Sequence, residues 1–98
     1  MKVVVFGSQG MAGHMVAAYL EQQGHTVVRV DRTVVDIEQP NEVHAYLKTV
    51  NCDFVINCIG LLVKASNDHP ARAIAINSWF PHYLEQHFKD TSTKVIHL

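Results

Sequence analysis

Three glycines follow the first apolar run of the chain at a fixed spacing, and they constrain the fold more than any other feature. The run Val3–Phe6 predicts a buried strand, and a helical pattern begins a few residues later. Gly7 would allow a tight turn, Gly10 would let a phosphate approach the backbone, and Gly13 would let the helix pack closely on the sheet. The turn therefore predicts a dinucleotide site with the pyrophosphate at the helix N-terminus.

The glycine turn has two other interpretations. A tight strand-to-helix turn that binds no ligand is the alternative to a dinucleotide site. A mononucleotide P-loop is excluded, because no Gly-Lys-Ser/Thr follows the glycines.

The rest of the chain alternates apolar strands with helical patterns. We expect further strands over 27–30, 54–59 and 95–98, and helices over 11–23, from Pro40 onward and between 71 and 88. Gly24 is expected to end the first helix, and Pro81 to kink or break the last one. The apolar residues that recur at helical spacing in the first helix are Met11, Met15, Val16, Tyr19 and Leu20.

Strands that are apolar on both faces and alternate with helices predict a parallel sheet covered on both sides. We therefore expect one α/β domain over residues 1–98, a Rossmann-like doubly wound parallel sheet that is incomplete at its C-terminal side. The loops 7–10, 31–32 and 58–60 would meet at the sheet edge where such folds bind ligands. The open outer edge of the last strand would also offer a surface for a homodimer.

An acidic residue ends the second predicted strand. Asp31 lies about 20 residues after the glycine turn, where a carboxylate can accept hydrogen bonds from the adenosine ribose. A solvated loop acid is the alternative. Arg32 could stack on adenine or bind a 2′-phosphate, whereas Asp31 would repel that phosphate. Either NAD or NADP is therefore expected as the cofactor, with a modest preference for NAD.

Composition and charge argue against several other classes of protein. A hydrophobic content of 48% argues against a disordered tail, and the net charge of −1 without a basic stripe argues against nucleic-acid or membrane partners. The start Met1-Lys2 predicts a cytoplasmic protein without a secretory signal. The seven histidines are scattered without ligand spacing, so no metal is expected. Cys52 and Cys58 are expected to be buried thiols, with a disulfide or a reactive thiol as the alternative.

The spacing Gly-x-x-Gly-x-x-Gly resembles the extended short-chain dehydrogenase/reductases, and within them the N-terminal part of dTDP-4-dehydrorhamnose reductase-like sugar-nucleotide reductases. Asp36-Ile37 resembles the family's pair that contacts adenine, and Asn57-Cys58-Ile59-Gly60 resembles the strand end that passes the cofactor's riboses. Ala75-Ile76-Asn77 resembles the helix whose Asn helps to organise the site. The loop Leu61–Lys64 is more apolar and basic than the acidic loop expected of rhamnose-pathway enzymes, which leaves the sugar open.

Pattern and resemblance together predict a set of cofactor-binding residues. These are Gly7, Ser8, Gln9, Gly10, Met11, Gly13, Asp31, Arg32, Asp36, Ile37, Cys58, Ile59, Gly60 and Asn77. The resemblance implies an NAD(P)-dependent oxidoreductase that reduces a nucleotide-linked 4-keto deoxy sugar. The family's catalytic Tyr-x-x-x-Lys pair does not occur in the 98 residues, so no catalytic residue is assigned. We expect an inactive N-terminal fragment without a substrate domain.

Two rival functions remain open at this point. A non-catalytic dinucleotide-sensing or interaction protein would keep the nucleotide site but have no Tyr-x-x-x-Lys further along the chain. A flavodoxin-like binding domain would not need an acid such as Asp31 at the end of the second strand.

Overall fold

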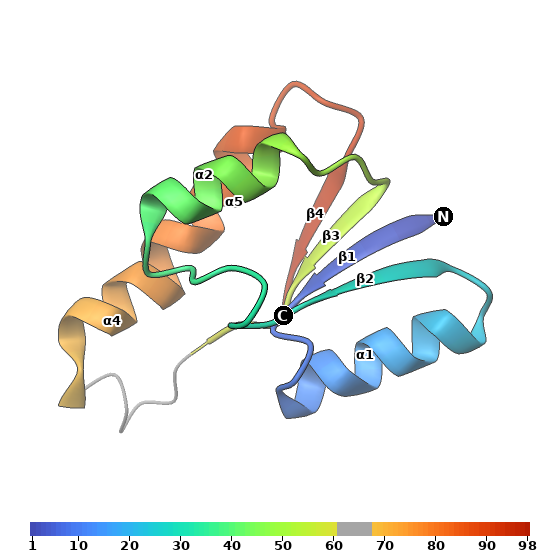
Figure 1. Ribbon diagram of the computed structural model, residues 1–98, viewed down its shortest axis with the longest axis horizontal. Helices are drawn as coiled ribbons and strands as arrows, with labels where there is room; N and C mark the ends of the chain where they lie inside the picture. Colours follow the sequence, from blue (N-terminus) through green and yellow to red (C-terminus); the bar gives the residue numbers. More distant parts are fainter. Residues whose placement is uncertain (61–67) are drawn as a thin grey trace.

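The computed structural model describes residues 1–60 and 68–98 and shows a parallel sheet with helices on both faces (Figure 1). The described strands, in the spatial order β2-β1-β3-β4, are β1 (Lys2–Phe6), β2 (Thr26–Val30), β3 (Phe54–Asn57) and β4 (Lys94–His97). One face carries α1 (Met11–Gln22), and the other carries α2 (Pro40–Lys48), α4 (Pro70–Ile74), the π-helical turn η1 (Ala75–Trp79) and α5 (Phe80–Phe88). The expected α/β Rossmann-like parallel sheet is therefore confirmed.

The central strand β1 holds the two layers of the core together. Alternate side chains of a strand point to opposite faces, and Val3 to Phe6 are all buried because both faces are covered. Phe6 packs edge-on against Phe80 of α5 at 5.1 Å between ring centroids. Val5 packs in a smaller cluster with Ala17 of α1. Full burial of side chains such as Phe6 stabilises the fold by about 1.5–3 kcal/mol each.

Helix α1 buries only part of the apolar pattern that its sequence shows. Met11, Met15 and Tyr19, which belong to the apolar spacing of this helix, are 86%, 66% and 60% exposed. The residues that face the sheet are small or medium-sized: Gly13, Val16, Ala17 and Leu20. The helix lies so close to the turn and the sheet that small residues set its buried face, and periodicity alone does not reveal that distance.

The proline in the last helical stretch is accommodated without ending the helix. Phe80 donates its N–H to the carbonyl of Ala75, which is an i→i+5 bond, and Pro81 follows at the start of α5. A regular helix would bring the Pro81 ring against the carbonyl of Asn77, and a widened turn relieves this contact. The expected kink or break is thus replaced by a π-helical turn between two α-helical segments.

Strand β4 lies at one edge of the described sheet, with β3 as its neighbour. The pairing of two chains through this edge stays a prediction. Among the helices of residues 1–60 and 68–98, none combines the length and the apolar character that crossing a bilayer requires.

We predict that Gly13→Ala destabilises the fold strongly. A Cβ atom at Gly13 would lie 1.9 Å from the carbonyl oxygen of Gly7, so backbone must move. The expected loss is at least about 2 kcal/mol of unfolding free energy, measured by urea denaturation. Gly60→Ala is the control, because its Cβ would meet Asn77 at an ordinary 3.7 Å. Equal stability of the two variants would contradict the packing role of Gly13.

Candidate functional site

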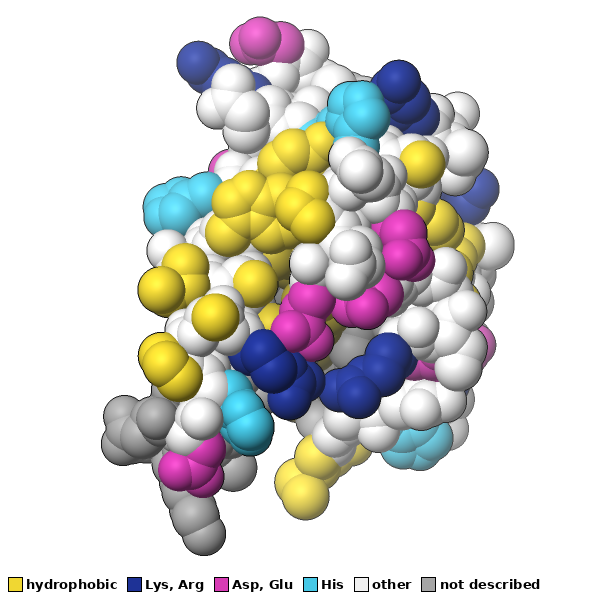
Figure 2. Space-filling model, turned by 60° about the vertical axis from the view of Figure 1, so that its left-hand side comes forward, with side chains coloured by type: hydrophobic (Ala, Val, Ile, Leu, Met, Phe, Trp, Pro, Cys, Tyr) yellow, Lys and Arg dark blue, Asp and Glu magenta, His cyan; other side chains and the backbone are white. Residues whose placement is uncertain are grey.

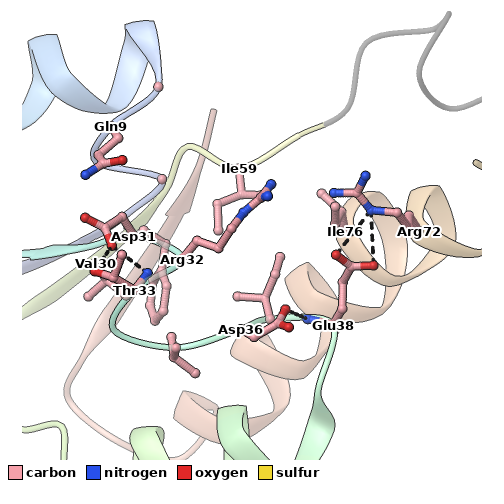
Figure 3. A pocket seen from close by; sticks show the side chains of 15 residues that line it. Gln9, Val30, Asp31, Arg32, Thr33, Asp36, Glu38, Ile59, Arg72 and Ile76 are labelled. Carbon is pink, nitrogen blue, oxygen red and sulfur yellow. Dashed lines mark hydrogen bonds and ion pairs between the residues drawn. The ribbon is translucent and has the colours of Figure 1, made fainter.

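A cavity of about 580 Å³ lies at the carboxyl ends of β1, β2 and β3. Figure 2 shows its mouth as a hollow flanked by acidic and basic side chains, and Figure 3 shows its lining. The sequence-predicted residues that line it are Gly7, Gln9, Gly10, Asp31, Arg32, Asp36, Ile37 and Ile59. The sheet topology thus brings three separate loops of the chain together, as expected.

The glycine turn leaves room for a ligand above α1. Gly7 has a φ of +79°, which favours glycine, and its N–H donates to the Val30 carbonyl at 2.9 Å. A Cβ on Gly10 would meet only the Gly7 carbonyl oxygen, at 3.3 Å, so the space beyond it is open. Gly10 is also the N-cap of α1 and contributes no side-chain cap. The N-terminus of α1 therefore fits the predicted binding of a pyrophosphate.

Asp31 is oriented by its own loop. Its carboxylate accepts hydrogen bonds from the backbone N–H of Thr33, at 2.7 Å, and from the Thr33 hydroxyl. The hydroxyl bond first, and then the backbone bond, hold the pKa of Asp31 below its usual range. The carboxylate is therefore ionised at neutral pH on the cavity wall, where it can accept further hydrogen bonds.

The loop after Asp31 supplies the apolar wall of the cavity. Val35 and Ile37 are buried there, while Asp36 accepts the backbone N–H of Glu38 at 3.0 Å. The N–H of Asp36 donates to Glu42 at 3.4 Å, which ties the loop to α2. Asp36 and Ile37 thus occupy one wall of the cavity, and their contact with adenine stays a prediction.

An ion pair that sequence reasoning missed connects two sides of the cavity. Nε of Arg72 on α4 donates to both carboxylate oxygens of Glu38, at 3.2 Å each. Figure 3 shows Arg72 and Arg32 reaching over the cavity from different elements, with Glu38 below Arg72. No pattern links residues 38 and 72, which belong to different elements, so only the fold reveals this pair.

The loop after β3 closes the cavity against the glycine turn. Asn57, which is 2% exposed, accepts the backbone N–H of Ile59 at 3.0 Å and turns the chain away from the sheet. The expected strand over 54–59 therefore ends at Asn57. A Cβ on Gly7 would lie 3.0 Å from Cγ1 of Ile59 and 3.1 Å from the Cys58 carbonyl group. Gly7 thus allows the two loops to touch.

Six predicted residues do not line the cavity. Ser8 and Gly13 are buried in the turn, and Met11 is exposed. The others, Cys58, Gly60 and Asn77, lie beside or behind the lining, with Asn77 3.7 Å from the Cβ position of Gly60. The loop Leu61–Lys64, whose apolar and basic character leaves the sugar open, lies outside the described residues.

The thiols and histidines carry no metal site in the described part of the chain. Cys52 is buried, Cys58 is half-buried, and both are free, as expected for structural thiols. Burial raises the pKa of each thiol, so neither is activated as a nucleophile. Residues 1–60 and 68–98 contain no group of three or more His, Cys, Asp or Glu side chains placed to hold a metal.

Comparison with known proteins places the chain in a family. The sequence matches the model of the RmlD substrate binding domain over residues 1–98. The chain belongs to this family. It is 31% identical over 98 residues to a dTDP-4-dehydrorhamnose reductase of Mycolicibacterium smegmatis, and the match covers 99% of this chain and 29% of that protein. The chain therefore spans less than a third of the length of this relative.

Solved structures show the same fold as this RmlD-family chain. A dTDP-4-dehydrorhamnose reductase of Clostridium acetobutylicum superposes with a TM-score of 0.84 at 21% identity, over 97% of this chain and 34% of that one. The enzyme of the same name from Bacillus anthracis, solved in complex with NADP, gives 0.81 at 17% identity, over 96% and 34%. The resemblance predicted from the glycine turn is confirmed.

We predict that Thr33→Val raises the pKa of Asp31 toward its ordinary value, because the hydroxyl donor is lost while the Thr33 N–H remains. A carboxyl with a lowered pKa stabilises the fold at neutral pH, and this contribution disappears as the pH falls through the lowered pKa. Carbon-13 NMR titration of the Asp31 carboxyl measures the change. Thr26→Val on β2 is the control, and an identical titration of Asp31 in the Thr33 variant would refute this cause.

Proposed function

We propose that this chain binds NAD(H) or NADP(H) across the turn Gly7–Gly13 and is the cofactor-binding part of a sugar-nucleotide reductase. The observation that carries the proposal is the turn itself, which leaves open space over Gly10 and leads into the cavity at the strand ends. A nicotinamide cofactor supplies hydride chemistry, and the protein supplies binding and orientation.

The relatives support the class of substrate and cofactor. The Mycolicibacterium relative is a dTDP-4-dehydrorhamnose reductase, and the Bacillus structure contains NADP. By this likeness the substrate of the longer protein is a nucleotide-linked 4-keto deoxy sugar. The remaining part of such a protein would hold that sugar, because the chain spans only 29% of the relative.

Each part of the cavity takes a separate portion of the cofactor in this proposal. Backbone N–H groups after Gly10 bind the pyrophosphate, and Asp31 accepts the ribose hydroxyls. Ile37 contacts the adenine and Ile59 lies beside the riboses, with Arg32 above the opening. Asn77, beside Gly60, keeps its expected role of organising the site through the strand end.

We expect the 98 residues by themselves to bind the cofactor without turning over a substrate. Four residues after Tyr19, Tyr46 and Tyr83 the sequence has Gln, Val and His, so no Tyr-x-x-x-Lys pair is present in it. Without a positioned acid, general acid–base catalysis worth about 10²–10⁴-fold is missing. A dinucleotide-sensing role is the second candidate, and a Tyr-x-x-x-Lys pair further along the chain would exclude it. We further propose a cytoplasmic location and pairing of two chains through the edge of β4.

We predict that Gly10→Val abolishes cofactor binding and leaves the fold intact. The added side chain would occupy the space proposed for the pyrophosphate, while its nearest neighbour in the protein is the Gly7 oxygen at 3.3 Å. NADH fluorescence titration of the purified chain measures binding. Ala18→Val, on the exposed side of α1, is the matched control. Equal NADH affinity in Gly10→Val and the parent would disprove the proposed site.

We predict that Asp31→Ala shifts the cofactor preference toward NADP(H). Removing a carboxylate removes repulsion of the 2′-phosphate, and ~1.4 kcal/mol of repulsion corresponds to about a tenfold change in the affinity ratio. Parallel titrations with NADH and NADPH give this ratio. Asp53→Ala at the amino end of β3 removes the same charge away from the cavity and should leave the ratio unchanged. An unaltered ratio in Asp31→Ala would show that Asp31 does not approach the ribose.

A further inference from the structure

A series of hydrogen bonds connects the edge strand β4 to the loop that closes the cavity. Glu85 on α5 lies 3.0 Å from Nε2 of His97, and Nδ1 of His97 lies 3.3 Å from Nδ2 of Asn57. Asn57 and His97 are direct partners in the register of β3 and β4. Oδ1 of Asn57 then accepts the N–H of Ile59. The series therefore starts at an exposed acid on a helix and ends at a residue that lines the cavity.

The orientation of Asn57 selects one protonation state of His97. Because Oδ1 of Asn57 faces the N–H of Ile59, the group that faces His97 is the NH₂, which only donates. Nδ1 of His97 must therefore accept, and its proton lies on Nε2, where it is donated to Glu85. The arrangement requires the neutral imidazole.

Protonation of His97 would bring two hydrogen-bond donors face to face, the N–H on Nδ1 of His97 and the NH₂ of Asn57. With a proton on Nδ1, the imidazolium faces the NH₂ of Asn57, and turning the Asn57 amide over would set the NH₂ against the N–H of Ile59 instead. Either arrangement loses a hydrogen bond at a buried side chain, where an unpaired group is costly.

The surroundings of His97 allow this change of charge. Among the elements of the described chain that pack on β4, α5 presents the ionisable Glu85 to His97 and β3 presents the uncharged Asn57. An ionised Glu85 would compensate for a charged imidazole. Protonation would therefore cost the Asn57 contact while keeping the contact with Glu85.

We propose that His97 is a positioning residue for the cofactor: its neutral form, acting through Asn57, holds Ile59 against the glycine turn, and its protonation weakens cofactor binding. Ile59 lies against Gly7, where a Cβ would be 3.0 Å from Cγ1 of Ile59. If the Asn57 amide turns over so that Oδ1 accepts from the protonated His97, it no longer accepts the N–H of Ile59, and the loop can then move away from the turn. The inference rests on the proposed function, since it assigns the cavity to the dinucleotide.

The first test compares NAD⁺ affinity by calorimetry at about pH 8 and about pH 5.5, on either side of the range in which histidine changes charge. We expect binding by the parent chain to be about five- to tenfold weaker at the acidic pH, which corresponds to one lost hydrogen bond. His97→Gln, which cannot become charged, should bind equally at both pH values. His25→Gln, whose ring contacts the N-terminus at the other end of the sheet, should keep the parent's pH dependence.

The second test needs no cofactor. In nitrogen-15 NMR spectra, the backbone amide of Ile59 and the side-chain amide of Asn57 should shift together as the His97 ring titrates. Glu85→Gln removes the carboxylate that pairs with His97 and leaves Asn57 unchanged, so the signals of the two amides should still shift together. This variant keeps the proposal testable if His97→Gln fails to fold, which circular dichroism would show.

The two tests separate the two proposals. If NAD⁺ does not bind at either pH while the Ile59 amide follows the titration of His97, the proposed function is wrong and the coupling stands. The coupling is wrong, and the proposed function stands, if NAD⁺ binds the parent equally at both pH values. The same holds if NAD⁺ binds and the Ile59 amide signal does not shift when His97 is protonated.

Discussion

The close contact between Gly13 and Gly7 is the constraint on which the rest of the site depends. Two backbone segments meet where any side chain would collide, with a Cβ of Gly13 only 1.9 Å from the Gly7 oxygen. This contact fixes the start of α1 directly beyond the end of β1. It places the first turn of the helix, and its free N–H groups, over the cavity at the strand ends. The helix cannot withdraw from the turn without giving up the packing of Ala17 on Val3 and Val5.

Much of the fold could be predicted from the sequence because local patterns determine it. The apolar run before Gly7, the Pro40 helix start and the strand at 54–57 all follow from composition and periodicity within a few residues. The buried face of α1 could not be predicted in this way. Met15 and Tyr19 carry the hydrophobic signal, but the short distance to the sheet selects Gly13 and Ala17 instead.

The candidate site also contains residues that local patterns predict and residues that only the packing of the elements reveals. Residues that follow a strand directly, such as Gly10, Asp31 and Ile59, could be placed because parallel strands end at one edge of the sheet. Arg72 and Glu38 could not, because their contact depends on where α4 passes the loop after β2. The role of Asn57 was assigned by resemblance to the strand end, whereas its bond to Ile59 is visible only in three dimensions.

The strand order has a consequence for how the chain folds. The central strand β1 pairs with β2 and β3. The sheet can form only when Lys2 pairs with Thr26 and Val3 pairs with Phe54, which lie far apart in the sequence. No two described strands form a hairpin, since every pair is parallel and is separated by a helix or a long connection. The chain loses the entropy of closing these loops before the strand pairs form and stabilise it. Folding is therefore slower than in chains rich in local contacts. Until β3 pairs with it, one edge of β1 is open to a strand of another chain, so the apolar run Val3–Phe6 is exposed to misassembly while the protein folds.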